Sequence, residues 1–475
     1  MKNRFFLYLL IIFLAVSCSE QPNEQKPNIL ILLADDLGYT DLNCFGGKAR
    51  TPNLDNLADN GIKFTHFYAP APNCSPSRTG LLTGRMPSRV GMYNYRAPEQ
   101  TMHLPDSEIT IAELLKKAGY QTAHFGKWHL SCLPHDPTLN QPQPVDQGFD
   151  YSLGTENNAN PSHLNPTNFV RNGKWVGETE GYSCQLVAKE VNTWFENIYK
   201  KEKPFFLYVA FHEVHAKIAS PENMIQNYPD VNKKEAEYLA NVENMDDASG
   251  RILKELETRG LLKNTIVVFA SDNGPYKRGS AGNLRGLKGE VYDGGIRVPG
   301  IFYWPAKIKG GQLNETPAGL VDVLPTLAEF CGFEIPNDRK TDGTNLAPLF
   351  NNKSIKRETP LMWFFYRSYP EISMRIDDYV LVGNALDSIP LTHRISDFDM
   401  DFIKSIELKE FELYNVIEDP SQQHNLAESN PDMLNKLKPQ MLKLLEEIKT
   451  EGPYWEGLPE YQSLRSRFKK GYIRK

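Results

Sequence analysis

The stretch Asn28-Ile29-Leu30-Ile31-Leu32-Leu33-Ala34-Asp35-Asp36, near the start of the chain, decides the fold. Its apolar run is unbroken, which is typical of a strand buried on both faces of a parallel sheet. Two carboxylates, Asp35 and Asp36, follow the strand directly. Because open α/β sheets place their sites just beyond the carboxyl ends of strands, this stretch predicts a fold class and one corner of a functional site.

Similar strand patterns recur along the chain and alternate with helical ones. Apolar residues have helical spacing in Glu108–Lys117 and again in Ala236–Gly260. Further strand candidates are Gln121–Phe125, Phe205–Phe211 and Thr265–Ala270. This alternation predicts an α/β sandwich around a large mixed, mostly parallel sheet, which we assign to residues 27–355.

The pattern changes after about Phe350. Short strand-like segments, Leu361–Tyr366 and Tyr379–Val382, follow one another, and Phe411–Pro420 leads to a helical segment at Pro431–Thr450. We therefore expect a smaller C-terminal subdomain, residues 356–475, in which a helix packs on an antiparallel sheet.

Composition gives no sign of a nucleic-acid partner. The 475 residues carry a net charge of -6, and no long basic run appears. An anionic substrate therefore requires cationic side chains gathered locally, because the surface as a whole does not attract it.

The N-terminus resembles an export signal. Lys2 and Arg4 precede the short apolar segment Phe5–Val16, which is below the roughly 20 residues that span a bilayer. Leu14–Cys18 resembles a bacterial lipobox, so we expect a signal peptide at residues 1–17, lipidation of Cys18 and a tether at 18–26. Export and lipidation machinery would be partners, and the protein would lie in the periplasm or at the cell surface, held by its lipid. Ordinary signal cleavage and secretion is the alternative.

The remaining cysteines do not define a metal site. No C-x-x-C spacing occurs, which argues against structural zinc. Export permits a disulfide, but spacing cannot pair the cysteines, and buried free thiols are an equal alternative. The residues concerned are Cys44, Cys132, Cys184 and Cys331.

Two polar pairs follow two of the expected strands. Asp35 and Asp36 come after the first strand, and Asp272 and Asn273 come after Thr265–Ala270. A single pair of this kind can be a helix cap, but two pairs at two strand ends are harder to explain in that way. Carboxylate and amide oxygens without His or Cys suit a hard cation, Ca²⁺ or Mg²⁺.

The most specific motif is Cys74-Ser75-Pro76-Ser77-Arg78 followed by Leu82-Thr83-Gly84. It resembles the signature of the type I sulfatases, which belong to the alkaline-phosphatase-like superfamily. The resemblance implies that a formylglycine-generating maturation enzyme oxidises Cys74 to Cα-formylglycine (3-oxoalanine). The hydrated aldehyde carries two hydroxyls: one attacks sulfur, and the other then expels sulfate, which solves the release problem of covalent catalysis.

The same resemblance assigns roles to other residues. It implies one Ca²⁺, with Mg²⁺ as a substitute, bound by Asp35, Asp36, modified Cys74, Asp272 and Asn273. Arg78 would stabilise the hydrated nucleophile, and Lys127 and Lys288 would contact sulfate. His129, in Gly126-Lys127-Trp128-His129, would take the proton when sulfate leaves. His215 would protonate the leaving sugar oxygen, with His212 as a competitor.

The substrate is the least determined feature. The resemblance implies an exo-acting glycan O-sulfatase, closest to enzymes that act on galactose or N-acetylgalactosamine sulfates. We expect specificity in residues 92–103, 133–146 and 157–168. The polar and aromatic candidates there are Tyr93, Arg96, His103, His135 and His163.

Two other functions deserve comparison. A phosphonate or phosphate monoester hydrolase of the same superfamily is the runner-up, although phosphate monoesters carry more charge and typically meet a second metal. A non-catalytic glycan-binding lipoprotein is less favoured, because such a copy should have lost Cys74, a metal ligand or a catalytic histidine.

Overall fold

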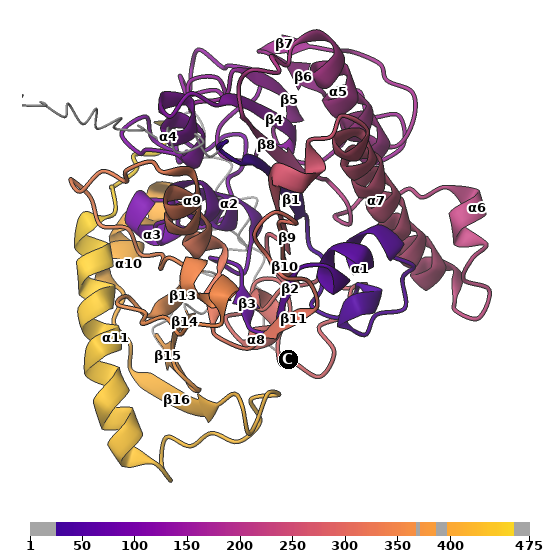
Figure 1. Cartoon of the computed structure of the whole chain (residues 1–475). Helices are drawn as coiled ribbons and strands as arrows, with labels where there is room; N and C mark the ends of the chain where they lie inside the picture. The colour runs from indigo at the N-terminus through magenta and orange to yellow at the C-terminus, as the bar shows by residue number, and fades with distance from the viewer. Residues whose placement is uncertain (1–24, 367–370, 386–396, 460–475) are drawn as a thin grey trace, which may run out of the picture.

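A computed structural model describes residues 25–366, 371–385 and 397–459. Its centre is a ten-stranded sheet in the order β11-β2-β10-β9-β1-β8-β4-β5-β6-β7 (Figure 1). The strands are β1 (Asn28–Ala34), β2 (Ile62–Phe64), β4 (Gln121–Lys127), β5 (Tyr151–Thr155), β6 (Val170–Arg171), β7 (Lys174–Trp175), β8 (Phe205–Ala210), β9 (Thr265–Ser271), β10 (Gly300–Tyr303) and β11 (Gln312–Asn314). A short pair, β3 (Phe67–Tyr68) and β12 (Ala318–Gly319), lies beside it.

The middle of the large sheet is parallel. Strand β1 pairs with β8 on one side and β9 on the other, and β4 and β5 continue the parallel run. The register aligns Leu33 with Ala210 and Ala34 with Ser271. The carboxyl ends of these strands therefore meet at one edge. Antiparallel β10, β6 and β7 make the sheet mixed, which confirms the predicted fold class.

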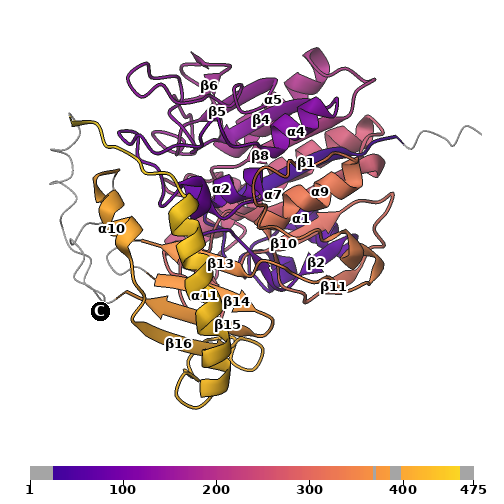
Figure 2. The same cartoon turned by 90° about the vertical axis from the view of Figure 1, so that its left-hand side faces the viewer.

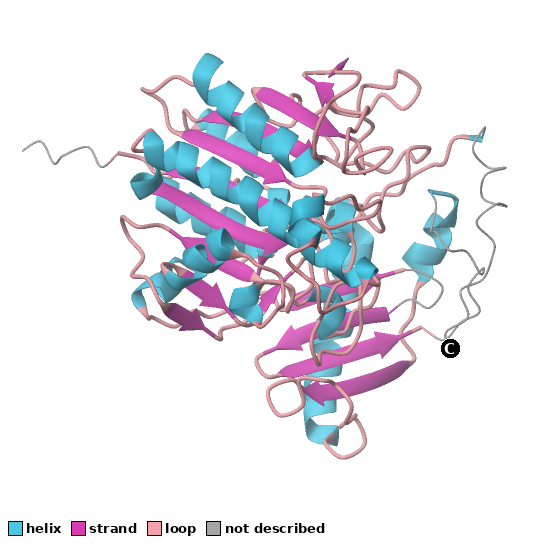
Figure 3. Cartoon of the chain, turned by 90° about the vertical axis from the view of Figure 1, so that its right-hand side faces the viewer, coloured by secondary structure: helices cyan, strands magenta, loops and turns pink. Residues whose placement is uncertain are grey.

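Helices cover both faces of the sheet. Ile29 and Ile31 of β1 belong to one core and Leu30 and Leu32 to the other, as expected of a strand without a solvent face. Helices packed on the two faces lie across the strands in Figure 3. One face packs on α1 (Pro52–Asp59), α5 (Ser183–Asn197) and α7 (Lys233–Thr258), and the other on α2 (Cys74–Thr83), α4 (Ile111–Lys117) and α9 (Val323–Cys331).

The C-terminal part forms a separate antiparallel sheet with a packed helix, as predicted. Its strands are β13 (Leu361–Phe365), β14 (Glu371–Ile376), β15 (Tyr379–Asn384) and β16 (Glu410–Asn415). Helix α11 (Pro431–Glu451) lies across this sheet, and α10 (Met400–Ser405) lies near the C-terminal end of α11 (Figure 2). The opposite face packs through Trp363 against Tyr68, Tyr292 and α8 (Asp293–Ile296). The domain boundary at residues 355 and 356 stays a prediction, because one continuous core includes side chains from both parts.

Short elements complete the described chain. The helices are α3 (Pro87–Val90) and α6 (Glu222–Ile225), and the 3-10 turns are at Asn43–Phe45, Leu262–Asn264, Leu320–Asp322, Ala347–Asn351 and Asp397–Asp399.

The cysteines of the described chain are free thiols. Cys74, Cys132, Cys184 and Cys331 are buried, and Cys44 is half-buried. The alternative without disulfides therefore holds for these five residues. The predicted signal peptide and Cys18 lie outside the described residues. Within the part of the chain that the structure describes, no helix combines the length and apolarity needed to cross a membrane.

The start of α4 corrects one predicted boundary. The helix begins at Ile111 rather than Glu108, because Thr110 forms a capping box: its hydroxyl accepts the Glu113 N–H at 3.1 Å, and Glu113 Oε2 accepts the Thr110 N–H at 2.8 Å. The Thr110 hydroxyl also donates to the Gln147 carbonyl at 2.8 Å.

We predict that Thr110→Ala lowers the free energy of unfolding by about 1–2 kcal/mol, because the N–H of Glu113 loses its acceptor. Urea unfolding of wild type, Thr110→Ala and Thr110→Ser measures this loss. The serine variant should retain most of the stability. Thr193→Ala, which removes a hydroxyl from the middle of α5, is the matched control. Equal losses in the alanine and serine variants of Thr110 would show that the cap is not the cause.

Candidate active site

The predicted site residues converge where the parallel strands end. Asp35 and Asp36 follow β1, and Asp272 and Asn273 follow β9. Lys127 is the last residue of β4, which extends two residues beyond the predicted strand. Cys74 is the first residue of α2, whose N-terminus faces this edge. Residues more than 200 positions apart in sequence thus meet because the register of β1 and β9 is fixed.

Three carboxylates and one thiol form the centre of the site. One ligand atom from each of Asp35, Asp36, Cys74 and Asp272 lies within 4.8 Å of the others, and all four residues are buried. The Asp36 backbone is left-handed, with φ of 65°. This conformation lets the Asp36 N–H donate to Asp272 Oδ1 at 3.2 Å, while Asp36 Oδ1 accepts from Asn273 Nδ2 at 2.8 Å.

Each carboxylate is paired with a cationic side chain. Lys127 Nζ lies 2.6 Å from Asp35 Oδ2, and Lys288 Nζ lies 2.6 Å from Asp36 Oδ1. The Arg78 guanidinium donates twice to Asp272 Oδ2, at 2.7 and 3.0 Å. The formal charges of these pairs cancel. Because a buried charge without its partner is strongly destabilising, the three cations are also structural requirements of the site.

The Cys74 thiol lies inside this charged cluster. Its Sγ atom is 3.3 Å from Lys288 Nζ and 3.5 Å from Asp35 Oδ1. Burial raises the pKa of Cys74 to about 12, and Lys127 and Lys288 offset this only in part. The unmodified side chain is therefore a neutral thiol near pH 7 and a poor nucleophile.

The carboxylates have unequal proton affinities. Burial alone would raise the pKa of Asp35, but Lys127, His215, Arg78 and Lys288 together hold it well below its usual range. Burial and the neighbouring Asp35 charge raise the pKa of Asp272 to about 6, against the effect of Arg78. The site thus concentrates negative charge on the oxygens nearest to Lys127.

The donor set fits a hard cation. Asp36 Oδ2 and Asn273 Oδ1 are both buried, and neither has a hydrogen-bond partner among the described residues. Buried polar atoms are normally paired, so two unpaired oxygens beside the carboxylates indicate a ligand. Carboxylate and amide oxygens are the ligands that Ca²⁺ and Mg²⁺ prefer.

His129 is oriented as a proton acceptor. Its Nε2 donates to the Arg96 carbonyl at 2.9 Å, which leaves Nδ1 as the basic nitrogen of the neutral ring. Nδ1 is buried without a partner in the described part of the chain. Burial, with Lys127 and Arg78, holds the pKa of His129 well below its usual range. The ring is therefore neutral near pH 7.

The two candidate histidines after β8 have different environments. His212 is 1% exposed, and its Nε2 donates to Thr155 Oγ1 at 2.8 Å. The His215 side chain is 21% exposed, its Nδ1 donates to the Ala216 carbonyl at 2.7 Å, and its Nε2 lies 3.7 Å from Asp36 Oδ2. Only His215 combines proximity to the cluster with access from outside, so the geometry favours it over His212. Burial lowers the pKa of His215, and Asp36 opposes that shift.

Glu213 was not among the predicted residues. Its carbonyl accepts the Asp35 N–H at 2.9 Å, and the next residue, Val214, donates to the Asp35 carbonyl at 2.7 Å. The buried Glu213 carboxylate accepts from Ser183 Oγ and from the Cys184 N–H at the start of α5. Glu213 therefore holds two loops together, the loop that carries His215 and the loop that carries Asp35. The sequence offered one signal that could have identified Glu213: an acidic residue between the two candidate histidines, His212 and His215.

The five residues proposed to contact substrate differ in their burial. Tyr93 is 4% exposed, with its hydroxyl on the Pro453 carbonyl at 2.7 Å, and His163 is 1% exposed, 3.2 Å from Asn241. Both side chains pack against other parts of the chain in this structure, and their contact with substrate stays a prediction. Arg96 is buried and bound to Gln141 and Glu156, so it supports His129. His103 is half-buried, and its Nδ1 is hydrogen-bonded to the Thr101 carbonyl, whereas His135 is exposed. The contact of these two histidines with substrate stays a prediction.

Comparisons with known proteins agree on one family. The family model for sulfatases matches residues 27–333, and a model of the C-terminal part of N-sulphoglucosamine sulphohydrolase matches residues 288–451. Human arylsulfatase A is 34% identical over 90% of this chain and 90% of its own. Human N-acetylgalactosamine-6-sulfatase is 35% identical over 72% of this chain and 69% of its own.

A solved structure gives the same result. The crystal structure of Ps i-CgsB in complex with k-i-k-neocarrahexaose has a TM-score of 0.78 and 26% identity, covering 94% of this chain and 98% of that one. The chain therefore belongs to the type I sulfatase family of the alkaline-phosphatase-like superfamily, and it is a sulfuric ester hydrolase.

Proposed function

We propose that this sulfatase is an exo-acting enzyme that removes sulfate from a carbohydrate, with Cys74 oxidised to formylglycine and one Ca²⁺ at the acid cluster. The observation that supports this most directly is the position of Cys74. Its side chain lies 3.3 Å from Lys288 Nζ and 3.5 Å from Asp35 Oδ1. A hydrated formylglycine at this position would carry two hydroxyls. One would be the nucleophile that attacks sulfur, and the other would then expel sulfate.

Asp35, Asp36, Asp272 and Asn273 are the residues that would hold the cation, together with modified Cys74; Mg²⁺ is the alternative ion. These residues would place a divalent cation where it could act as a Lewis acid on a sulfate oxygen. Since the three carboxylates and their three cationic partners balance formally, a divalent ion gives the site the net positive charge that a sulfate monoester requires. A phosphate monoester carries nearly two negative charges, so the preference for sulfate rests on the family assignment rather than on this charge balance.

The surrounding side chains have separate roles in the proposed reaction. Lys127 and Lys288 neutralise the sulfate oxygens, and Arg78 holds Asp272 and the Lys127 carbonyl in place. His129 Nδ1 takes the proton of the second hydroxyl when sulfate leaves. His215 Nε2 donates a proton to the sugar oxygen, and the negative charge of a bound sulfate favours the protonated imidazole.

The carbohydrate assignment comes from the relatives. One relative is named for N-acetylgalactosamine 6-sulfate, and one structural neighbour contains a neocarrahexaose. We therefore propose galactose or N-acetylgalactosamine sulfates, in a glycosaminoglycan or an algal polysaccharide, as the substrate class.

Maturation and location form a linked proposal. Pro76 and Arg78 would present Cys74 to a formylglycine-generating enzyme before folding, because both are buried in the folded chain. The pattern of residues 1–18 supports export, lipidation at Cys18, and a position in the periplasm or on the cell surface.

We predict that Cys74→Ala lowers kcat/KM for an aryl sulfate by about 10⁴-fold or more, because the nucleophile is lost. Thermal unfolding should remain close to wild type. Cys331→Ala is the matched control, because burial also raises the pKa of that thiol to about 12 and it lies on α9, outside the cluster. Mass spectrometry of the Cys74 peptide checks the modification. An active Cys74→Ala variant would refute the mechanism, and wild-type preference for aryl phosphate would favour the phosphoester alternative.

We expect Asp36→Asn to weaken Ca²⁺ binding by about 100-fold or more, because a ligand charge is removed while its size is kept. Calorimetric titration of Ca²⁺ into chelator-treated protein measures this change. Asp246→Asn is the control: Asp246 is equally buried but accepts from the Leu54 N–H at 2.8 Å and does not belong to the cluster. Equal loss of Ca²⁺ affinity in both variants would point to general destabilisation.

For the anchor, Cys18→Ser should move the protein from the membrane fraction to the soluble exported fraction. The lipid supplies the binding energy, which amounts to about 0.8 kcal/mol for each buried CH₂ group. Cys44→Ser is the control and should stay membrane-bound. Fractionation and the mass of the N-terminal peptide report the result, and an unlipidated wild-type N-terminus would favour simple secretion.

A further inference from the structure

One exposed aromatic side chain lies beside the reactive centre. Tyr276 is three residues after Asn273, at the turn that leads to Lys288, and it is 46% exposed. Its ring centroid is 6.0 Å from Lys288 Nζ, and the same ammonium is 3.3 Å from Cys74 Sγ. Lys288 thus lies between the ring and the reactive residue, and the ring centroid is at most about 9 Å from the sulfur of Cys74.

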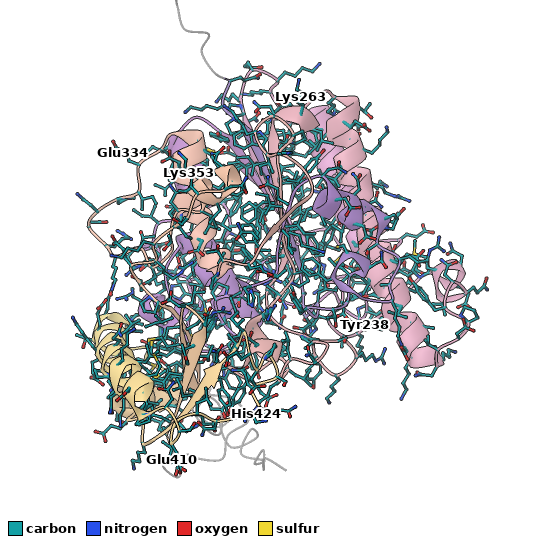
Figure 4. The ribbon with its side chains drawn as sticks, turned by 60° about the horizontal axis from the view of Figure 1, so that its bottom comes forward. Tyr238, Lys263, Glu334, Lys353, Glu410 and His424 are labelled. Carbon is teal, nitrogen blue, oxygen red and sulfur yellow. The ribbon has the colours of Figure 1, made fainter. Side chains whose placement is uncertain are left out.

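The turn that presents Tyr276 is firmly held. The Lys288 N–H donates to the Pro275 carbonyl at 2.9 Å, and Arg278 pairs with Glu237 of α7 at 2.9 Å. Gly279 packs so closely that an added Cβ would lie 2.4 Å from the hydroxyl oxygen of Tyr238, whose position on α7 is labelled in Figure 4. The exposure of the ring is thus a feature of a fixed turn.

The backbone of this turn is strained as well as packed. Lys277 has φ of 38°, in the left-handed region that residues other than glycine rarely adopt. Strain of this kind concentrates at functional sites, where surrounding contacts hold it. The packing of Gly279 and the ion pair of Arg278 supply those contacts.

We propose that Tyr276 is a specificity residue: its ring stacks against the apolar face of the sugar that carries the scissile sulfate. This proposal deepens the carbohydrate assignment and rests on it. A pyranose has a face of C–H groups that suits an aromatic ring, and a rigid ring loses little entropy on contact. Sulfate then lies toward Lys288 while the sugar lies over the ring.

The charges around the ring indicate the kind of molecule it accepts. Lys277 Nζ is 5.0 Å and Lys288 Nζ is 6.0 Å from the centroid. Two ammonium groups beside a single ring suit a polar, anionic saccharide, whereas a large apolar alcohol would have to desolvate them at a cost. The surroundings of Tyr276 therefore favour a sulfated sugar over a lipid or steroid sulfate.

The test compares Tyr276→Ala, Tyr276→Phe and wild type on a panel of sulfated galactose and N-acetylgalactosamine saccharides. We expect the alanine variant to raise KM by about 10- to 50-fold with kcat changed by less than about threefold, and phenylalanine to restore KM. The inhibition constant of inorganic sulfate and the Ca²⁺ affinity should not change, because the sulfate-binding groups are intact.

Tyr303→Ala is the control. Tyr303 pairs with Val267, toward the end of β9 away from Asp272, and lies near Lys263, which Figure 4 labels at the top of the view, well apart from Tyr238. Saccharide turnover with unchanged KM in Tyr276→Ala would overturn the stacking role alone. A parallel loss of kcat, sulfate inhibition and Ca²⁺ affinity would show a structural role instead. Wild-type turnover of aryl sulfate without any saccharide turnover would overturn the carbohydrate assignment and the stacking role together.

Discussion

The structure of this sulfatase depends on three carboxylates buried together at the ends of β1 and β9. Parallel register places Asp35 and Asp36 beside Asp272, so their negative charges cannot be separated without breaking the sheet. Such a cluster is stable only if cations face it, and Lys127, Lys288 and Arg78 supply them. The chain brings these cations from β4, from α2 and from a loop after β9. The packing of distant segments is therefore coupled to the electrostatics of one small volume.

This constraint also supports the proposed modification of Cys74. The charge pairs are buried away from water, and the same burial raises the pKa of Cys74 to about 12 despite two neighbouring ammonium groups. A thiolate nucleophile is incompatible with that environment near pH 7. A carbon with two hydroxyls does not depend on the ionisation of a thiol, and the neutral His129 ring is ready to accept a proton. The same burial thus disfavours one nucleophile and suits the other.

The sequence predicts the buried parts of the molecule better than the exposed parts. The strand Asn28–Leu33 and the acids after it follow from an unbroken apolar run, and the structure places them at the centre of the sheet. The helix α5 was not anticipated, nor was the role of Glu213 at its start. Tyr93 illustrates why side chains in loops are harder to predict. Its hydroxyl donates to the carbonyl of Pro453, and no local sequence pattern links two positions that far apart in the chain. Side-chain direction in loops depends on such tertiary contacts, so composition alone cannot separate packing residues from substrate contacts.

The distribution of exposure across the site separates chemistry from specificity. Arg78, Lys127 and Asp35 are fully buried, so a change at any of them disturbs a charge pair and the fold with it. Tyr276, by contrast, is 46% exposed at the rim and belongs to none of the charge pairs, so its substitution would leave the cluster intact. Relatives that share the buried cluster can therefore differ in substrate through rim residues alone. Recognition of the sugar is thus adjustable in this architecture, whereas the machinery that breaks the sulfate ester is fixed by the conditions of its own stability.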